Sequence, residues 1–359
     1  MIFYVWMSWI FVPYILGKGL KMKTIKMKTM KQFFKLSIFI WASIALFGCS
    51  KEDFYDLDEP GLLVPLTVDE NPELPSIRVN GTMLHSEAYG NPEDPMIVAI
   101  HGGPGGDYRS LLCSRDLVDH GYYVVFYDQR GAGLSQRHDA DHFTVQMYID
   151  DLHAVIQYYR QGENQKVILL THSWGSMLAA GYVNDYPEAI DGLVLAEPGG
   201  FTFDQTMDYL SRSNKVAFFE EATNDAIFPE QIFAGRSEHE ILDYKALYFL
   251  SFENAEGNTI GNAGPYPFWR NGAVAASASA DYVAEYGFDF TGNLGNYSQK
   301  VLFLYSELNE AYGKDWANEV AAPFPNKDID IVVGAGHEVF YFGWDDMFPK
   351  VLAYLDEIQ

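Results

Sequence analysis

The chain has 359 residues, of which 48% are hydrophobic and 16% aromatic, so it is long and apolar enough to bury one large core. The first 48 residues contain seven lysines and no acid, while the whole chain has 49 acidic and 24 basic residues. The remaining 17 basic and 49 acidic residues leave a net charge near −32. This charge disfavours nucleic acid and anionic lipid headgroups as partners.

The N-terminus has the pattern of a bacterial lipoprotein signal peptide. A basic segment, Lys21–Lys35, precedes an apolar segment, Leu36–Leu46, which is too short to span a bilayer comfortably. The following Leu46-Phe-Gly-Cys49 resembles a lipobox, in which the cysteine thiol accepts a diacylglycerol. We therefore expect residues 1–48 to be removed and Cys49 to be lipidated, which anchors the mature protein to a membrane.

The residues around this signal refine the expectation. Residues 1–20 contain a second apolar run, for which a mis-called start is the simplest account. Cys49-Ser-Lys-Glu-Asp53 resembles the surface-export signal of some Gram-negative lipoproteins. We expect the protein in the bacterial cell envelope, anchored to the outer membrane, and the export signal favours exposure on the cell surface.

The segment between the lipid and the folded domain is acidic, contains prolines and lacks periodicity. We expect residues 49–75 to form a tether. Ile77–Leu84 then has apolar runs on both sides of Asn80-Gly81, the strongest short hairpin signal. A β-hairpin is therefore predicted at the antiparallel start of a sheet.

Buried strands are predicted where short apolar runs end in turn residues. Strands and helical patterns alternate from residue 96 to residue 197, and 147–160 is one of those helical patterns. We therefore expect an α/β chain with a doubly wound, mostly parallel sheet. The predicted strands are Met96–Ile100, Tyr122–Tyr127, Val167–Leu170, Gly192–Ala196, Val301–Tyr305 and Ile329–Val333.

Two of these strands lead into turns whose residues are typical of catalytic sites. Thr171-His-Ser-Trp-Gly175 is one residue away from the G-x-S-x-G nucleophile elbow, a strained turn that lifts a serine, here Ser173, above the sheet. Gly175 is expected because the following helix passes close to the strand. The glycine-rich His101–Asp107 follows another strand, so the N–H groups of Gly103 and Trp174 are predicted to form an oxyanion hole.

Residues 201–300 break the alternation and are predicted to form a cap over the site. Phe201–Phe252 has a helical pattern, and 273–280 consists almost entirely of small residues. The cap is rich in aromatic residues, some of which can line an apolar pocket for a proline ring or an acyl chain. It also contains fourteen acidic and six basic residues.

One loop offers potential metal ligands. Arg137-His-Asp-Ala-Asp-His142 contains two histidines and two aspartates, but four ligands so close on one loop rarely converge on one ion. We favour a solvated loop and expect neither a metal nor another cofactor.

The combined motifs resemble the proline iminopeptidase branch of the α/β-hydrolase serine peptidases. The matching residues are His101-Gly-Gly-Pro-Gly105, Tyr127-Asp-Gln-Arg-Gly-Ala-Gly-Leu-Ser135, Ser173-Trp-Gly-Ser176 and Gly336-His337. His172 stands where that family usually has glycine. The resemblance covers 76–199 and 301–359, and it implies an α/β-hydrolase core in 76–200 and 301–359 with a mainly helical cap.

The resemblance also implies the remaining members of a catalytic triad. His337, at the tip of the last strand, corresponds to the general base. Most relatives have an aspartate after the strand that follows the cap, but Asn309 occupies that position here. Glu310 is adjacent, and Glu197 ends a strand from which some α/β-hydrolases supply their acid. We favour Glu197 and retain Glu310 as the alternative.

The predicted function is hydrolysis through an acyl-enzyme on Ser173. The resemblance implies an aminopeptidase that releases an N-terminal residue, often proline, from short peptides. A carboxylesterase or lactonase with the same triad is the alternative, so the expected partner is a small peptide or ester substrate. A non-catalytic ligand-binding homologue is a third reading, raised by the amide at Asn309.

Overall fold

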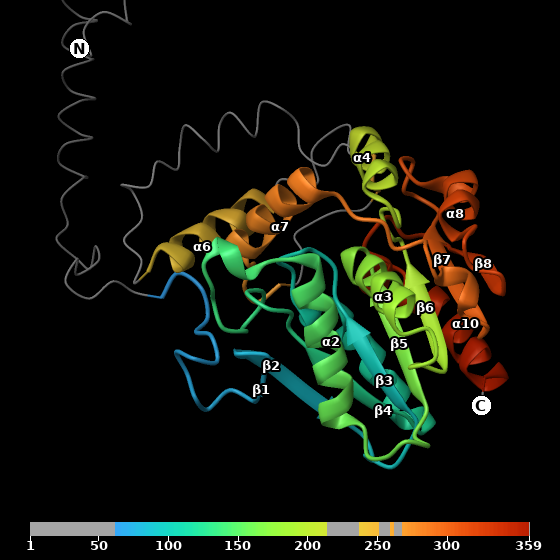
Figure 1. The fold of residues 1–359 in the computed structure, drawn as a ribbon, viewed down its shortest axis with the longest axis horizontal. Helices are drawn as coiled ribbons and strands as arrows, with labels where there is room; N and C mark the ends of the chain where they lie inside the picture. Colours follow the sequence, from blue (N-terminus) through green and yellow to red (C-terminus); the bar gives the residue numbers. More distant parts are fainter. Residues whose placement is uncertain (1–61, 214–236, 251–258, 262–267, 359) are drawn as a thin grey trace, which may run out of the picture. The chain divides into compact units, whose positions relative to one another are not determined.

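The computed structural model describes residues 62–213, 237–250, 259–261 and 268–358, whose centre is one eight-stranded sheet (Figure 1). Its strand order is β1-β2-β4-β3-β5-β6-β7-β8. β2 pairs antiparallel with β1 and β4, and all pairings from β4 to β8 are parallel, so the predicted mostly parallel sheet is confirmed. The strands are β1 (Ser76–Val79), β2 (Thr82–Tyr89), β3 (Met96–Ile100), β4 (Tyr123–Tyr127), β5 (Val167–His172), β6 (Gly192–Ala196), β7 (Val301–Ser306) and β8 (Lys327–Val332).

The predicted hairpin joins β1 to β2. Asn80 and Gly81 both have positive φ, 42° and 76°, as a two-residue turn between antiparallel strands requires. Val79 pairs directly with Thr82. The hairpin therefore forms the antiparallel edge of the sheet, as predicted.

Helices cover both faces of the sheet. Residues of α2 (Val145–Tyr159), α3 (Trp174–Asp185) and α8 (Gly313–Ala321) share one hydrophobic core with the strands. Those of η1 (Tyr108–His120), a 3₁₀ helix, and of α10 (Trp344–Glu357) share the second core, together with the short α9 (Val339–Phe342). In Figure 1, α2 and α3 lie over the same face of the central strands. The sheet is therefore doubly wound.

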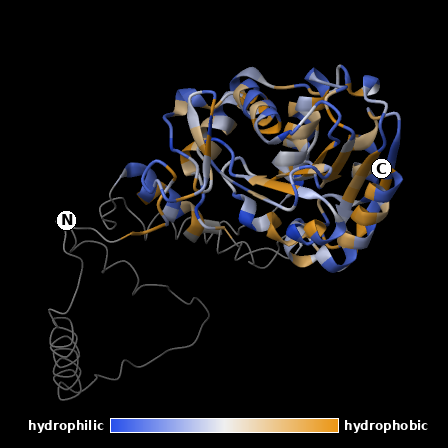
Figure 2. Cartoon of the chain, turned by 90° about the horizontal axis from the view of Figure 1, so that it is seen from below, coloured by the Kyte–Doolittle hydropathy of each residue, from blue (hydrophilic) through white to orange (hydrophobic). Residues whose placement is uncertain are grey.

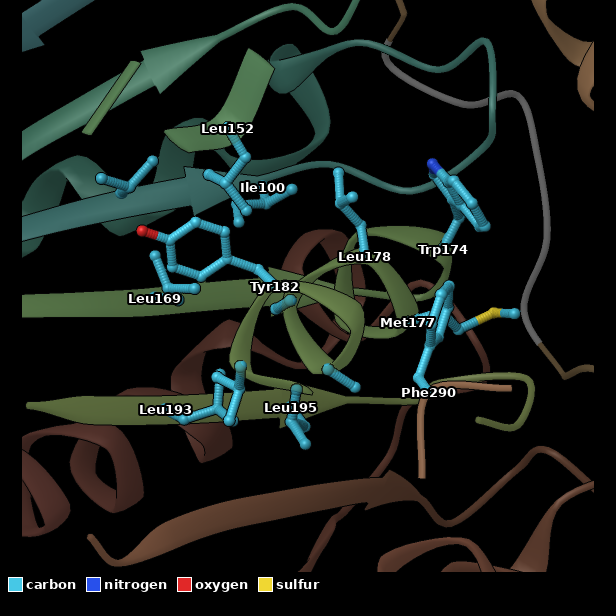
Figure 3. Packing of buried hydrophobic residues seen from close by; sticks show 14 of the residues in the cluster. Ile100, Leu152, Leu169, Trp174, Met177, Leu178, Tyr182, Leu193, Leu195 and Phe290 are labelled. Atoms are coloured by element: carbon cyan, nitrogen blue, oxygen red, sulfur yellow. The ribbon is translucent and has the colours of Figure 1, made fainter. Parts of the chain in front are cut away.

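Alternation along the central strands supplies both cores. In β3, Val98 and Ile100 belong to the core under α2 and α3, whereas Ile97 and Ala99 belong to the core on the opposite face. Figure 3 shows α3 contributing Leu178 and Tyr182 to the first core. Hydrophobic colouring accordingly follows the central strands in Figure 2.

The cap lies between β6 and β7 in the chain. Its described helices are α4 (Phe203–Arg212), α6 (Glu238–Leu250), α7 (Ala273–Tyr286) and the short 3₁₀ helix η4 (Leu294–Asn296). The small residues at 273–280 fall in α7, while the part of the predicted helical segment at 214–236 lies outside the described residues. Thr202 caps α4 by accepting a hydrogen bond from the Gln205 N–H, which explains where that helix begins.

The described end of the expected tether packs against the domain. Val64 and Val68 are buried, and the Val68 N–H donates to the Leu134 carbonyl. The Leu63 N–H donates to Glu240 in the cap. Residues 62–75 therefore belong to the folded unit, because their valines bury apolar surface that a free tether would expose to water.

No helix within the described ranges is both long and apolar enough to cross a bilayer. The expected signal peptide and the expected lipidation site, Cys49, lie outside the described residues.

Candidate active site

Ser173 sits in a strained turn between β5 and α3. Its φ of 54° and ψ of −122° are unusual for a residue with a side chain, and its N–H donates to the Ala196 carbonyl at the end of β6. A Cβ on Gly175 would lie 2.3 Å from the Ile100 carbonyl oxygen, so the helix passes close to the end of β3 and not, as predicted, to the strand that it follows. The structure therefore has the elbow that the sequence pattern predicts.

His337 follows β8 and faces this serine. Its Nε2 lies 3.0 Å from Ser173 Oγ, and its Nδ1 lies 3.1 Å from Glu197 Oε2. Nδ1–H donates a hydrogen bond to the carboxylate, so Nε2 of the neutral ring is the acceptor for the serine hydroxyl. The structure thus joins Ser173, His337 and Glu197 in one chain of hydrogen bonds.

Glu197 is fully buried at the end of β6, with φ of 54°. Its Oε1 accepts from the N–H and the hydroxyl of Ser306, at 2.6 and 2.9 Å. Its Oε2 accepts from Asn309 Nδ2 at 2.6 Å. Burial raises the pKa of Glu197 to about 7, although these hydrogen bonds to the charged form oppose the rise.

The alternative acid, Glu310, has an exposed side chain. Asn309, by contrast, is buried, and its amide reaches both Glu197 and the Tyr209 hydroxyl, at 2.6 and 3.0 Å. That hydroxyl lies 3.4 Å from His337 Nδ1. Asn309 and Tyr209 are therefore site residues that the sequence analysis did not assign. The amide at 309 was a signal for the acid's position, but no local pattern pointed to Tyr209.

His172 explains one departure from the family pattern. Its side chain is buried, and Nε2 donates to the His337 carbonyl over 2.7 Å. The two imidazole rings lie with their centroids 4.9 Å apart. Glycine at this position would have no side chain to hold the loop that carries His337. His172 is therefore a further site residue that the sequence analysis did not assign.

The glycine-rich loop lies beside the serine. A Cβ on Gly102 would lie 3.0 Å from Ser173 Cβ, and Gly103 and Trp174 line the same cavity as Ser173 and His337. Gly103 and Trp174 thus share this cavity with the serine, and the oxyanion role of their N–H groups stays a prediction.

Two buried side chains hold that loop in place. His101 Nδ1 donates to the Gly102 carbonyl, and its Nε2 accepts from the Gln129 N–H. Burial lowers the pKa of His101, which keeps the ring neutral and able to accept. The Gln129 side chain donates to the His101 carbonyl and accepts from Trp174 Nε1. Gln129 therefore links the Trp174 side chain to His101, which precedes the glycine-rich loop.

A cavity of about 320 Å³ opens from Ser173 and His337. Its walls come from α3, the start of α2, and the cap helices α4 and α7. The volume lies at the small end of the range typical of small-molecule sites, about 300–1,000 Å³. A small substrate can therefore reach the serine between the core and the cap.

The loop with potential metal ligands divides its side chains among different partners. Arg137 forms an ion pair with Asp243 in the cap, and His138 contacts Thr82. His142 contacts the neighbouring Asp141. Arg137 and His138 thus contact elements outside the loop, while the rings of His138 and His142 stack with their centroids 5.0 Å apart.

Within the described ranges, one group of three residues has the spacing of a metal site: His172, His337 and Glu338. Both ring nitrogens of His337, however, lie within hydrogen-bond distance of Ser173 and Glu197. His172 Nε2 is likewise engaged with the His337 carbonyl. These contacts fit a proton-transfer chain better than an ion site.

Part of the chain is similar to known peptidases. Residues 91–222 match the family model described as serine aminopeptidase, S33. A proline iminopeptidase of Saccharolobus solfataricus is 35% identical over 101 residues, covering 28% of this chain and 32% of that one. A proline iminopeptidase of Pestalotiopsis fici is 24% identical over 289 residues, covering 78% of this chain and 99% of that protein. The chain spans about a third of the length of the first-named relative.

Solved structures are similar in fold to most of this chain. A carboxylesterase of Nitrososphaera gargenis superimposes with a TM-score of 0.58 at 16% identity, covering 79% of this chain and 98% of that one. A proline iminopeptidase-related protein of Thermus thermophilus gives a TM-score of 0.54 at 21% identity, with 80% and 99% covered. The chain has the α/β-hydrolase fold. The fold prediction is thus confirmed.

In this α/β-hydrolase fold, the three candidate residues follow three different strands. Ser173 follows β5, Glu197 follows β6 and His337 follows β8. All three lie at the carboxyl ends of parallel strands, where open α/β sheets bind their ligands. The carboxylate after β6 thus reaches the histidine, and the amide after β7 contacts that carboxylate.

Proposed function

We propose that the protein is a serine hydrolase that cleaves carboxylic esters through an acyl-enzyme. The observation that supports this most directly is the continuous line from Ser173 Oγ through His337 to Glu197, with steps of 3.0 and 3.1 Å. A serine hydroxyl is too weakly acidic to attack a carbonyl unaided at neutral pH, so an adjacent base is required.

In the first half of the proposed reaction, His337 Nε2 takes the hydroxyl proton while Ser173 Oγ bonds to the carbonyl carbon. Glu197 stabilises the imidazolium that forms, and the N–H groups of Gly103 and Trp174 stabilise the oxyanion. His337 then gives its proton to the leaving alcohol. In the second half, His337 deprotonates a water molecule, which releases the acid and restores the serine.

The aminopeptidase activity predicted from the sequence is supported by the names of the relatives and by the matched family description. An exopeptidase must hold the protonated amine of its substrate, and burying an ammonium in a partly dry pocket requires a carboxylate. The described residues that line the cavity include no aspartate or glutamate. This lining supports ester hydrolysis, including that of lactones, better than amine recognition.

The binding-protein alternative depended on the amide at Asn309. That alternative loses support because a carboxylate is present beside the histidine although residue 309 is an amide. Glu197 Oε2 lies 3.1 Å from His337 Nδ1. A buried carboxylate, a histidine and a serine in hydrogen-bond contact are costly to retain in a site that only binds ligands.

The test is labelling with a fluorophosphonate, combined with hydrolysis of p-nitrophenyl butyrate. We expect the wild type to be labelled and active, and Ser173→Ala to lose both properties while keeping its melting temperature within a few degrees. Ser176→Ala, which changes the nearby buried serine of α3, is the matched control for specific labelling at residue 173. Full labelling of Ser173→Ala would refute the assignment.

We also propose that the mature protein begins at a lipidated Cys49 and is held at the outer membrane. The support is the order of basic, apolar and small residues before Cys49. The acidic segment after it keeps the domain in the aqueous phase.

A further inference from the structure

The wall of the cavity is built from apolar side chains. Phe143 and Val145 line it before and at the start of α2, Met177 lines it from α3, and Leu210 and Val283 line it from the cap. These residues come from both the core and the cap. A group that is bound in the cavity is therefore in contact with hydrocarbon on several sides.

The buried polar groups of the wall are satisfied by the protein itself. The Tyr148 hydroxyl lies 3.0 Å from Ser279 Oγ, so these two side chains bond to each other. Trp174 Nε1 donates to Gln129, and the Tyr209 hydroxyl accepts from Asn309. A polar substituent on the substrate would compete with bonds that already exist.

The described acids of the cap are engaged elsewhere or face solvent. Asp243 is buried and pairs with Arg137 and Arg270, at 2.9 and 2.7 Å. Glu240 accepts a hydrogen bond from the Leu63 N–H. The remaining described acids of the cap are exposed: Asp204, Asp208, Glu238, Asp281, Glu285 and Asp289.

We propose that the acyl half of the substrate is an uncharged, apolar group that occupies this cavity, and that a free α-amine is rejected. This inference rests on the proposed acyl-enzyme function and narrows its substrate class. An ammonium in the cavity would lose its water and gain no carboxylate from the described wall, which disfavours it strongly. Each methylene that enters the cavity contributes about 0.8 kcal/mol, or about a fourfold rise in kcat/KM.

A matched pair of substrates separates the effect of the substrate's amine charge from the effect of its ring shape. Proline and cyclopentanecarboxylic acid have rings of the same size, but only the first carries an amine. Both would be supplied as p-nitrophenyl esters and as p-nitroanilides, and kcat/KM would be compared within each leaving group. We expect the cyclopentanecarbonyl ester to react at least about tenfold faster than the prolyl ester. A prolyl substrate that reacts as fast or faster would overturn the inference.

A variant pair tests whether the cavity holds the acyl chain. Ala280 lines the mouth of the cavity and is exposed, so Ala280→Leu narrows the cavity without disturbing a core. Ala284 is exposed one turn further along α7 and does not line the cavity, so Ala284→Leu is the control. With p-nitrophenyl acetate, butyrate, hexanoate and octanoate, the wild type should gain about fourfold per methylene until the cavity is full.

Ala280→Leu should lower kcat/KM for the longest ester by about tenfold and leave the acetate nearly unchanged, since a leucine side chain displaces about two methylenes' worth of contact. Ala284→Leu should match the wild type for every ester. Equal chain-length profiles for all three proteins would refute the assignment of this cavity to the acyl group.

Fluorophosphonate labelling distinguishes failure of the proposed substrate class from failure of the proposed function. A labelled protein that prefers prolyl substrates contradicts only the substrate class. An unlabelled, inactive protein contradicts the serine hydrolase function.

Discussion

The side-chain amide of Asn309 donates to the carboxylate of Glu197 over 2.6 Å. The opposite atom of that amide, Oδ1, is buried and has no hydrogen-bond partner in the described part of the chain. If the amide were reversed, its oxygen would face a carboxylate, so Glu197 dictates the orientation. A buried unsatisfied acceptor costs about 1–3 kcal/mol, which a hydrogen bond to a charged group can offset. Asn309 therefore positions the carboxylate that faces His337.

Replacing this amide should change the pH at which the enzyme works. Asn309→Leu removes a hydrogen bond to the charged form of Glu197, so the pKa of Glu197 should rise by about one to two units. The acidic limb of the kcat/KM profile should then move to higher pH. The measurement is the pH dependence of ester hydrolysis, and an unchanged profile would show that Asn309 is only a packing residue.

Asn309→Asp is the informative comparison for that variant. Two carboxylates in this contact cannot both ionise easily, so they should share one proton near neutral pH. The protonated partner can still donate to the ionised one. We therefore expect Asn309→Asp to retain more activity at pH 7 than Asn309→Leu.

The two candidate acids should respond very differently to neutralisation. Glu197→Gln should lower kcat by about 10⁴-fold, because the imidazolium of His337 then lacks its counter-charge. Glu310→Gln should stay within about twofold of the wild type, since its exposed side chain contributes little. Steady-state kinetics on one ester, with melting temperatures as a check on folding, decides between them. The reverse ranking would move the acid to Glu310.

The raised pKa of Glu197 has opposite effects on activity and stability. Activity should fall as the pH drops through about 7, because the protonated carboxyl cannot stabilise the imidazolium. The folded protein, however, takes up this proton between pH 7 and 4.5, the ordinary pKa of a glutamate, where the unfolded chain does not. Glu197 therefore makes the native state more stable as the pH falls through that window.

Comparing the wild type with Glu197→Gln separates the contribution of Glu197 to the pH dependence of stability from that of the other titrating groups. The difference in free energy of unfolding between the wild type and Glu197→Gln should favour the wild type by about 3 kcal/mol more at pH 5 than at pH 8. Urea unfolding at the two pH values measures it. A constant difference would mean that Glu197 has an ordinary pKa in the folded state.

The proposed anchor predicts a change of compartment. The wild type should partition into the detergent phase with the membrane fraction, and Cys49→Ser should be released or mislocalised, because no diacylglycerol can be attached. Cys113→Ser keeps the proposed acceptor thiol and is the matched control. Fractionation and phase separation with detergent give the readout. A wild-type protein found wholly in the aqueous phase would exclude lipidation, and protease treatment of intact cells tests surface exposure separately.

Local sequence patterns were sufficient to predict the sheet and to single out Ser173 and His337, which follow two of its strands. Ser173 follows the uninterrupted apolar run Val167–Leu170, and His337 follows Ile329–Val333, a run that Asp330 interrupts, so both side chains could be placed beyond predicted strands. Glu197 could be favoured only indirectly, through the amide at Asn309. The structure places its carboxylate against His337.

The supporting contacts could not be predicted, because they join residues that are far apart in sequence. His172 and His337 are separated by 165 positions, and their contact depends on how two distant strands end side by side. The same holds for Gln129 and Trp174, which are 45 positions apart. The apolar character of the cavity could not be predicted from the sequence either. The cap sequence has an excess of acids, and only the fold shows that its described acids lie away from the wall.

The ion pairs of Asp243 have a consequence for how the chain folds. Arg270, which pairs with Asp243, also donates to the Pro65 carbonyl, a contact that spans 205 positions. Leu63 and Glu240 are joined across 177 positions. Contacts of such long range are associated with slow folding, because loop closure must precede them. The N-terminal residues of the folded domain therefore gain these contacts only when residues far along the chain are available, wherever the chain folds.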